Sequence, residues 1–258
     1  MKFWAKLLRR IILIDSFFVL VATEMKRYYR DKKRFLASIV LPIIWLLIFG
    51  AGFGLSFRYG FADISYQQYI LPGIIGMTIL FGSMWSGSSL LKEKQNGMEK
   101  ITKTSTIPFI MLIGSKTMAT SVFTSLQVII LLALYSVFIS FIPPYLVFLV
   151  LCLAMLLAFV FSLLGILIVS FVDTQESYDT VTNILILPLL FLSGALFPVD
   201  KSVIWMQYVS NANPLTYGID AMHNVLLGVS NHSIYFDVGV ILSSLVVLFF
   251  LSKLAIKN

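Results

Sequence analysis

The sequence predicts an all-α polytopic membrane protein with six transmembrane helices, and three observations support this fold class. Hydrophobic residues make up 59% of the 258 residues and charged residues 12%, against about 25% charged in an ordinary globular domain. The mean hydropathy of +0.95 leaves too little polar surface for a protein in water. Long runs of the chain contain no charged residue, which is typical of helices that cross a membrane.

Six segments are apolar enough to cross a membrane as helices, which takes about 20 residues. The first four hold no charge, the fifth is shorter and contains three polar residues, and the sixth carries Asp237 at its outer edge. The predicted spans are Phe35–Phe57, Tyr69–Leu91, Thr117–Ile142, Tyr145–Val172, Val181–Phe197 and Phe236–Ser252. Residues 1–34 then form a basic cytoplasmic segment, and residues 35–258 form one membrane domain.

The distribution of basic residues predicts the orientation of these spans. Seventeen of the 19 Lys and Arg residues lie in the N-terminal segment, the loop after the second span and the C-terminal tail. Such residues concentrate on the cytoplasmic side. The sequence therefore predicts a multi-pass protein of the plasma (inner) membrane with both termini in the cytoplasm. The loop Asp173–Asp179 is an exception, because it should be cytoplasmic yet has no Lys or Arg.

The N-terminal segment predicts an interfacial helix on the cytoplasmic membrane surface. Its apolar run Ile11–Ala22 is too short to cross the membrane and contains Asp15, and no cleavage site follows it. Membrane lipid is thus an expected partner, and a disordered basic tail attracted to anionic lipid is the alternative. The residues assigned to this helix are Lys26, Arg27, Arg30 and Asp31.

The cytoplasmic loop after the second span is rich in charge and predicts a short helix from about Met98. Met98 and Ile101 would lie one turn apart among exposed charges. Such a helix suits insertion into a groove on a soluble partner, and a solvated turn is the alternative. The candidate docking residues are Glu93, Gly97, Met98, Glu99, Lys100 and Ile101.

Between the fifth and sixth spans the sequence predicts two short external helices. Asp200 can cap the first, Lys201–Val209, and Asn213-Pro214 begins the second, Pro214–Leu227, which ends at Gly228. Both are too short to span and too apolar for an aqueous loop, so we expect a re-entrant pair. The pair is interpreted either as the gate of an exit route or as a structural lid. Its selected residues are Trp205, Asn213, Pro214, Tyr217, Asp220 and His223.

Small residues one turn apart in the second span, Gly82 with Ser86 and Ser83 with Gly87, predict a face that packs against protein. That face is either a dimer seam or part of the packing within one chain. If the chain conducts a molecule across the membrane, spans 2 and 5 are predicted to line the path. The candidate path and gate residues are Phe81, Met84, Trp85, Phe191, Leu192 and Phe197.

Three blocks of sequence occur in a recognisable order. They are Arg30–Arg34 running into Leu41-Pro42, then Glu93–Lys100, then Leu192–Pro198 followed by Asn213–Met222. Together they resemble the permease subunits of type 2 ABC exporters, in particular the daunorubicin-resistance and nodulation-factor-export group. Ser105 stands where this family often has proline, and His223 stands where it favours arginine.

The resemblance implies that the N-terminal helix is the family's connecting helix and that Glu93–Thr104 is its coupling helix. The implied partners are two copies of a cytoplasmic ABC ATP-binding subunit and a second permease copy, identical or paralogous. ATP and Mg²⁺ would bind the partner subunit, and neither a cofactor nor a metal site is expected in this chain. The sequence has no Gly-x-x-x-x-Gly-Lys-Ser/Thr phosphate loop, so we expect no enzyme activity of its own.

Other classes of function fit the sequence less well. The first five spans hold no Asp or Glu at depth, which argues against a carrier driven by an ion gradient. An intramembrane protease would need Ser88 or Ser89 near His223, but these are predicted on opposite sides of the membrane. No nucleic-acid partner is expected. The sequence thus predicts an ATP-driven exporter permease for an amphiphilic, drug-like or lipid-linked cargo. Polysaccharide or lipid-linked-glycan export, and a membrane assembly factor without an ATPase, remain alternatives.

Overall fold

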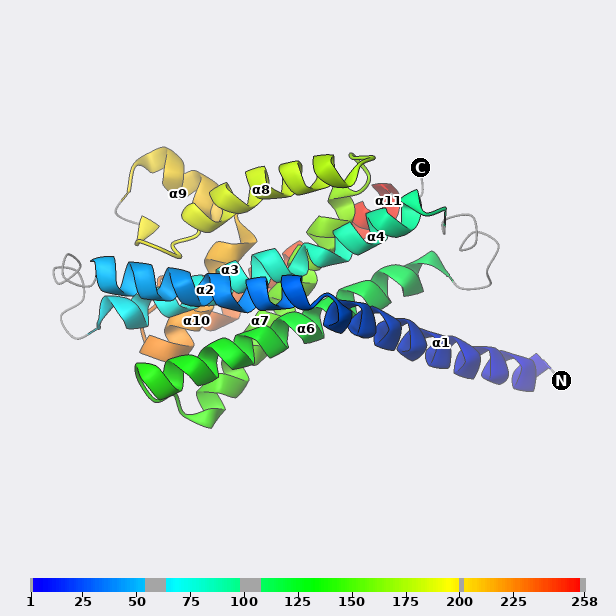
Figure 1. The fold of residues 1–258 in the computed structure, drawn as a ribbon, viewed down its shortest axis with the longest axis horizontal. Coiled ribbons are helices and arrows are strands. Elements are labelled where there is room, and N and C mark those ends of the chain that lie inside the picture. The colour runs from blue at the N-terminus through cyan, green and yellow to red at the C-terminus, as the bar shows by residue number, and fades with distance from the viewer. Residues whose placement is uncertain (1, 54–63, 98–107, 200–201, 256–258) are drawn as a thin grey trace.

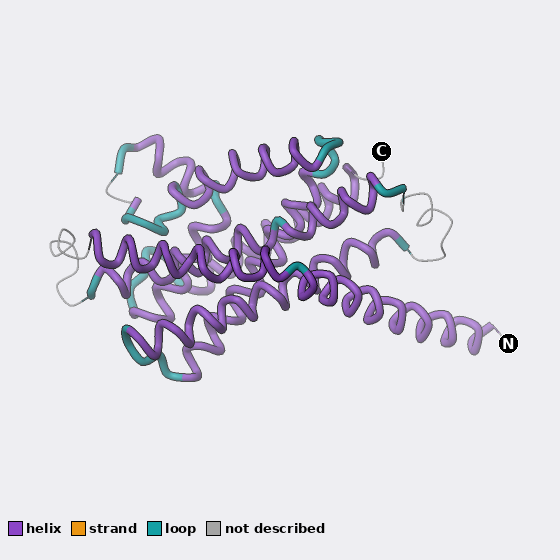
Figure 2. The backbone as a smooth tube through the Cα atoms, viewed as in Figure 1, coloured by secondary structure: helices purple, strands orange, loops and turns teal. Residues whose placement is uncertain are grey.

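The computed structural model describes residues 2–53, 64–97, 108–199 and 202–255, and within these ranges all regular structure is helical (Figures 1 and 2). The helices are α1 (Lys2–Arg30), α2 (Lys32–Phe53), α3 (Tyr66–Ser83), α4 (Trp85–Gln95), α6 (Phe109–Phe138), α7 (Pro144–Ile168), α8 (Gln175–Phe191), α9 (Ile204–Asn211), α10 (Pro214–Leu227) and α11 (Ile234–Ala255). The predicted all-α fold class is confirmed.

Four helical stretches in the described ranges are long and apolar enough to cross a membrane. They are Tyr66–Gln95, Ile110–Phe138, Pro144–Ile168 and Ile234–Ala255. These stretches correspond to the second, third, fourth and sixth predicted spans. The other two predicted spans correspond to α2, whose apolar part is Leu36–Gly50, and to α8, which is 17 residues long. A crossing by α2 and α8 therefore stays a prediction.

The fifth predicted span differs from the helix found there. The helix α8 begins at Gln175, capped by the Thr174 side chain, and ends at Phe191, whereas the prediction ran from Val181 to Phe197. Both predicted boundaries rested on hydropathy alone, and the hydropathy stays high through the apolar residues that follow the helix. The chain turns after Phe191, and Gly194 has a φ of 79°, a left-handed conformation that favours glycine.

The helices form an elongated bundle with two distinct ends (Figure 1). One end, which we call the basal end, carries the start of α1, the end of α4, the start of α8 and the end of α11 (Figure 1). The opposite, apical end carries α9 and the end of α2 (Figure 1). Of the segments predicted to be cytoplasmic, the start of α1, the end of α4, the start of α8 and the end of α11 lie at the basal end, while the junction of α1 with α2 lies nearer the middle (Figure 1).

The stretch formed by α3 and α4 lies in the middle of the bundle. In its most apolar part 94% of the residues are buried, against 11% for α11, which lies at the periphery. The helix α3 packs on α2, α6, α7 and α10. The span that carries the predicted path is therefore surrounded by protein, whereas α11 presents its apolar side chains outward.

The chain bends at Met84, where α3 ends and α4 begins. The Tyr28 hydroxyl donates to the Gly82 carbonyl, and the Tyr178 hydroxyl donates to the Met84 carbonyl, each at 2.7 Å. A break in a buried helix is stable when such groups satisfy its backbone. Residues of α1 and α8 thus help to hold the bend in the central span.

The small residues of the second span face protein, as predicted. Gly82, Ser83, Ser86 and Gly87 are all buried. A Cβ atom added at Gly87 would overlap with the Gly165 carbonyl and the Tyr178 hydroxyl. The close approach is therefore between α4 and α7 within one chain, which agrees with the intramolecular alternative for this strip.

The external helices agree only in part with their prediction. The second, α10, covers Pro214–Leu227 as predicted, with Asn213 as its cap and Gly228 at a φ of 70°. The first, α9, begins at Ile204 rather than Lys201, after Val203, which makes no side-chain cap. The proposed cap Asp200 lies outside the described residues. At the N-terminus, α1 is confirmed as a helix, and its place at a membrane surface stays a prediction.

We predict that Gly87→Ala destabilises the protein by about 1–3 kcal/mol, because the new methyl group overpacks the contact of α4 with α7. Thermal unfolding in detergent micelles measures the change. The matched control is Gly52→Ala in α2, where an added Cβ meets nothing within 4 Å. An equal unfolding midpoint for both variants would show that the Gly87 contact is not tight.

Candidate functional site

An apolar cavity of about 240 Å³ lies between α2, α3 and α8. Almost no polar atom contributes to its wall. The side chains and backbone that form it are Leu41, Trp45, Phe49, Gly73, Ile74, Met77, Phe81, Leu187, Leu190, Phe191 and Leu196. Such a wall offers dispersion contacts and hydrophobic burial to a bound group but hardly any hydrogen bonds.

The structure brings two of the predicted path residues to this cavity, Phe81 and Phe191. Leu192 and Phe197 lie in the turn after α8 and do not line it. The helices that contribute Phe81 and Phe191 were predicted from hydropathy. The contribution of α2 was missed, although Leu41, Trp45 and Phe49 recur one turn apart, which is the signal that would have identified it.

Met84 and Trp85 do not line the cavity and pack against other helices instead. Trp85 packs against Tyr28 of α1, with ring centroids 4.6 Å apart. Tyr28 in turn contacts Phe123 of α6 at 3.8 Å between centroids. Met84 is 2% exposed and packs beside Gly165 of α7. Both residues thus serve helix packing in the single chain rather than lining the cavity.

A cluster of charged side chains, two of them buried and two partly exposed, joins α1, α4 and α6 at the basal end. Lys116 of α6 is 1% exposed. Its Nζ lies 2.6 Å from Glu24 Oε1 and 3.0 Å from Glu93 Oε2. Arg27 of α1 pairs with both carboxylates, at 3.0 Å from Glu24 Oε1. We call these four residues the basal charge cluster.

The basal charge cluster is balanced and hydrogen-bonded. It holds two carboxylates and two cations, and the Ser89 hydroxyl donates to Glu24 Oε2 while it accepts from Lys116, both at 3.0 Å. Buried charges are tolerated when they are paired in this way. The sequence interpretation missed the cluster, since it counted Lys116 as a loop residue. The available signal was a lysine inside the otherwise uncharged helix Phe109–Phe138.

The cluster borders the loop that is predicted to dock on a partner. Glu93 in α4 and Lys116 in α6 stand on either side of that loop, and both are tied to α1. Of the predicted docking residues, Glu93 points into the cluster, and Gly97 follows α4 with a φ of 72°. Met98, Glu99, Lys100 and Ile101 lie outside the described residues. On α1, Lys26 and Arg30 are exposed, whereas Arg27 faces the cluster and Asp31 follows the helix.

At the apical end, α10 is fastened to its neighbours by the residues selected from the sequence. The Asn213 side chain accepts from the Leu215 backbone N–H and donates to the Leu189 carbonyl of α8 at 2.7 Å. His223 Nε2 lies 2.9 Å from the Tyr69 carbonyl of α3 and donates to it, since a carbonyl only accepts. Burial lowers the pKa of His223, against the opposing effects of this bond and of Asp220.

The helix α9 presents apolar side chains outward. Trp205 is 60% exposed, and Ile204 and Tyr208 on the same helix are more exposed still. Tyr217 of α10 donates from its hydroxyl to the Asn211 carbonyl at the end of α9, at 2.7 Å. The pair thus consists of one helix buried in the bundle and one helix with an uncovered apolar face.

Comparison with known proteins gives one family and several relatives. Residues 15–227 match the family described as ABC-2 type transporter. The chain is 30% identical over 211 residues to the ycf38 transport permease of Cyanophora paradoxa, covering 80% of this chain and 72% of that protein. It is 26% identical to nodulation protein J of Rhizobium meliloti (strain 1021), covering 92% of each. It is 25% identical to the daunorubicin resistance ABC transporter permease protein DrrB1 of Streptomyces coeruleorubidus, covering 79% of this chain and 71% of that protein.

We predict that Lys116→Met lowers the free energy of unfolding by about 3–5 kcal/mol, because it leaves Glu24 and Glu93 with one cation between them in a buried site. Thermal unfolding in detergent measures the loss. Lys94→Met is the matched control, since Lys94 pairs with Asp173 at 3.6 Å on the surface. That variant should cost less than about 1 kcal/mol. Equal costs for the two variants would contradict the role of the cluster.

Proposed function

This chain belongs to the family of ABC-2 type transporters, and from that premise we propose that it is the transmembrane permease subunit of an ATP-driven exporter. The observation that carries the proposal is the family match over residues 15–227, joined to a sequence without a phosphate-binding loop. The energy for transport would then come from a separate ABC ATP-binding subunit, present in two copies, which holds ATP and Mg²⁺.

The proposed topology has six crossings, with α2 and α8 as the first and fifth. The basal end faces the cytoplasm, and the protein lies in the inner membrane. Support comes from the basic residues of the described segments that reach the basal end, such as Lys92, Lys94 and Lys253. The exposed apolar side chains of α9 suit the outer interface of the bilayer. The interfacial position of α1 stays a prediction, because α1 extends from the bundle close to its long axis (Figure 1).

The proposed coupling runs through the loop between α4 and α6. ATP binding would draw the two partner subunits together, and a helix near Met98 would transmit that motion to the membrane domain. The basal charge cluster supports this route because it ties α4 and α6 to the same helix, α1. A displacement of the loop would then move these three helices together rather than bend the loop alone.

The proposed cargo is amphiphilic, drug-like or lipid-linked. The apolar cavity supports this class, because its wall suits a hydrocarbon or aromatic group and leaves a polar group without partners. The cavity lies beside exposed apolar side chains of α2 and α8, such as Leu47 and Ile184. A second permease copy, identical or paralogous, would cover these faces and complete the path.

The proposal is tested by co-expressing the chain with the ABC ATP-binding subunit encoded beside it. We predict that Gly97→Trp combined with Glu99→Ala lowers complex formation and the stimulation of ATPase activity at least about tenfold, the effect of losing about 1.4 kcal/mol of binding. Gly97→Asn is the control, because asparagine tolerates the left-handed backbone found at this position. Cargo transport by the permease alone in proteoliposomes, with no nucleotide, would overturn the proposal.

We further predict that Met77→Trp lowers ATP-dependent cargo export by at least about tenfold, because the larger side chain fills the apolar cavity. Complex formation with the ATP-binding subunit should persist. Leu126→Trp on the exposed face of α6 is the control for the bulk of tryptophan. Export by Met77→Trp at the level of Leu126→Trp would exclude this cavity from the path.

A further inference from the structure

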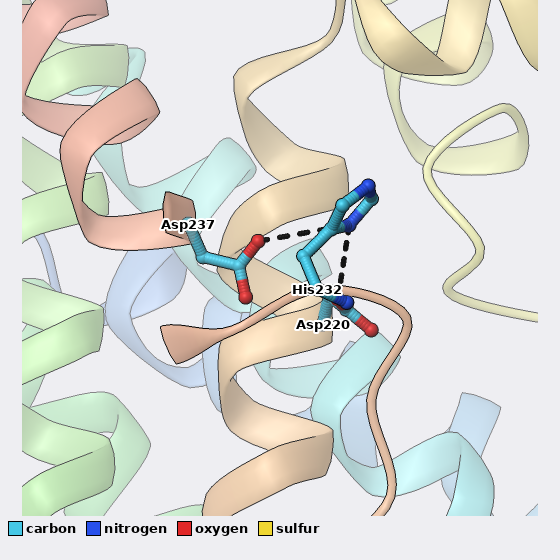
Figure 3. A group of neighbouring side chains, drawn as sticks. All are labelled: Asp220, His232 and Asp237. Atoms are coloured by element: carbon cyan, nitrogen blue, oxygen red, sulfur yellow. Dashed lines mark hydrogen bonds and ion pairs between the residues drawn. The ribbon is translucent and has the colours of Figure 1, made fainter. Parts of the chain in front are cut away.

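Three side chains from separate segments meet at the apical end, Asp220 of α10, Asp237 of α11 and His232 of the connection between them (Figure 3). His232 Nδ1 lies 3.3 Å from Asp220 Oδ2 and 3.9 Å from Asp237 Oδ1. One ligand atom of each residue lies within 4.8 Å of those of the other two. Both carboxylates therefore converge on one imidazole nitrogen.

Asp237 is the unusual member of this group. Its side chain is 0% exposed, and neither carboxylate oxygen has a hydrogen-bond partner among the described residues. A buried carboxylate without donors is costly unless it takes up a proton or a positive charge compensates it. The carboxylate points toward His232 (Figure 3), so the compensating charge is expected in the space between the three side chains.

The geometry around the group is held by the backbone and by aromatic rings. Asp220 accepts from the backbone N–H groups of Asn231 and His232, each at 2.9 Å. These bonds fix the turn that presents the imidazole. The rings of Tyr217 and Phe236 lie 5.7 and 5.3 Å from that imidazole, measured between ring centroids. The side chain of His232 is 39% exposed, which leaves an approach from outside.

We propose that Asp220, His232 and Asp237 bind a divalent transition-metal ion of the zinc type. One imidazole nitrogen and two carboxylate oxygens form a ligand set that Zn²⁺ accepts. Bonds of about 2.0–2.2 Å in a tetrahedral site place ligand atoms roughly 3.3–3.6 Å apart. The pair formed by His232 and Asp220 already has this spacing, and a small rotation of Asp237 brings in the third ligand.

Charge and ligand number both favour this class of ion. Two carboxylates and a neutral imidazole carry two negative charges, which one divalent cation balances. Calcium takes about 6–8 oxygen ligands and magnesium retains several waters in an octahedral shell. Three ligand atoms, one of them nitrogen, therefore suit zinc better, and water on the exposed side of His232 would complete the coordination. The bound ion would fasten α10 to α11.

The test uses the full-length chain purified in detergent without a polyhistidine tag and stripped of metal with a chelator. We expect saturable binding of about one Zn²⁺ per chain by calorimetry, and a visible absorption band when Co²⁺ is used as the spectroscopic probe. Zn²⁺ should also raise the midpoint of thermal unfolding, because it binds the folded chain. Ca²⁺ and Mg²⁺ at equal concentration should produce neither the calorimetric signal nor the thermal shift.

Two variants test the assignment of ligands. His232→Ala and Asp237→Asn should each weaken Zn²⁺ binding by at least about tenfold. His232 is partly exposed, so its variant is expected to fold even if Asp237→Asn does not. Asp173→Asn, at a carboxylate that is 95% exposed, is the control and should bind as the unmodified chain does. Absence of saturable Zn²⁺ and Co²⁺ binding, or binding that His232→Ala leaves unchanged, would overturn the proposal. No transport or ATPase assay enters this test, so its result is independent of the proposed function.

Discussion

The basal charge cluster is the interaction on which the arrangement of this protein depends. Lys116 is a cation inside the bundle, where a charge without a partner is strongly unfavourable. Its partners come from α1 and α4, so the three helices can satisfy it only when they meet at one place. The cluster therefore fixes where α1 joins the bundle. Around this point α1 also contributes Tyr28, whose hydroxyl bonds the bend of the central span.

The need of buried polar groups for partners also explains the side-chain hydrogen bonds of Tyr178 and Asn213 elsewhere in the bundle. Backbone groups at membrane depth need partners within the protein, so an irregular backbone is tolerated only where side chains reach it. Tyr178 performs this role at the bend after α3, and Asn213 performs it at the end of α8. These bonds connect the two breaks in regular structure to neighbouring helices. The apolar cavity lies between the breaks, bounded by α3 and α8, so its shape depends on them.

The sequence predicted the features that local signals specify. The bounds of α10 were predicted because Asn213-Pro214 and Gly228 are strong signals for a start and an end. Hydropathy identified four spans but set the end of α8 too late, because the turn that follows is also apolar. Within the candidate site, Phe81 and Phe191 were predicted, while Trp85 was misplaced, because it packs against α1 instead. The basal charge cluster was missed because Lys116 was counted as a loop residue, and because Glu93 and Lys116 lie far along the chain from their partners on α1.

The two ends of the bundle differ in how their buried charges are balanced. At the basal end two cations face two carboxylates, so the helices there are stabilised by groups of the chain itself. At the apical end Asp220 and Asp237 face a single imidazole, and Asp237 has no hydrogen-bond donor among the described residues. Burial without a donor favours either a proton on Asp237 or a cation beside it. An ion bound as proposed above would make the packing of α10 on α11 depend on the surrounding solution, whereas the junction of α1, α4 and α6 is balanced by groups of the chain itself. Under the proposed topology the apical end faces the exterior, so it would be the end that external conditions adjust.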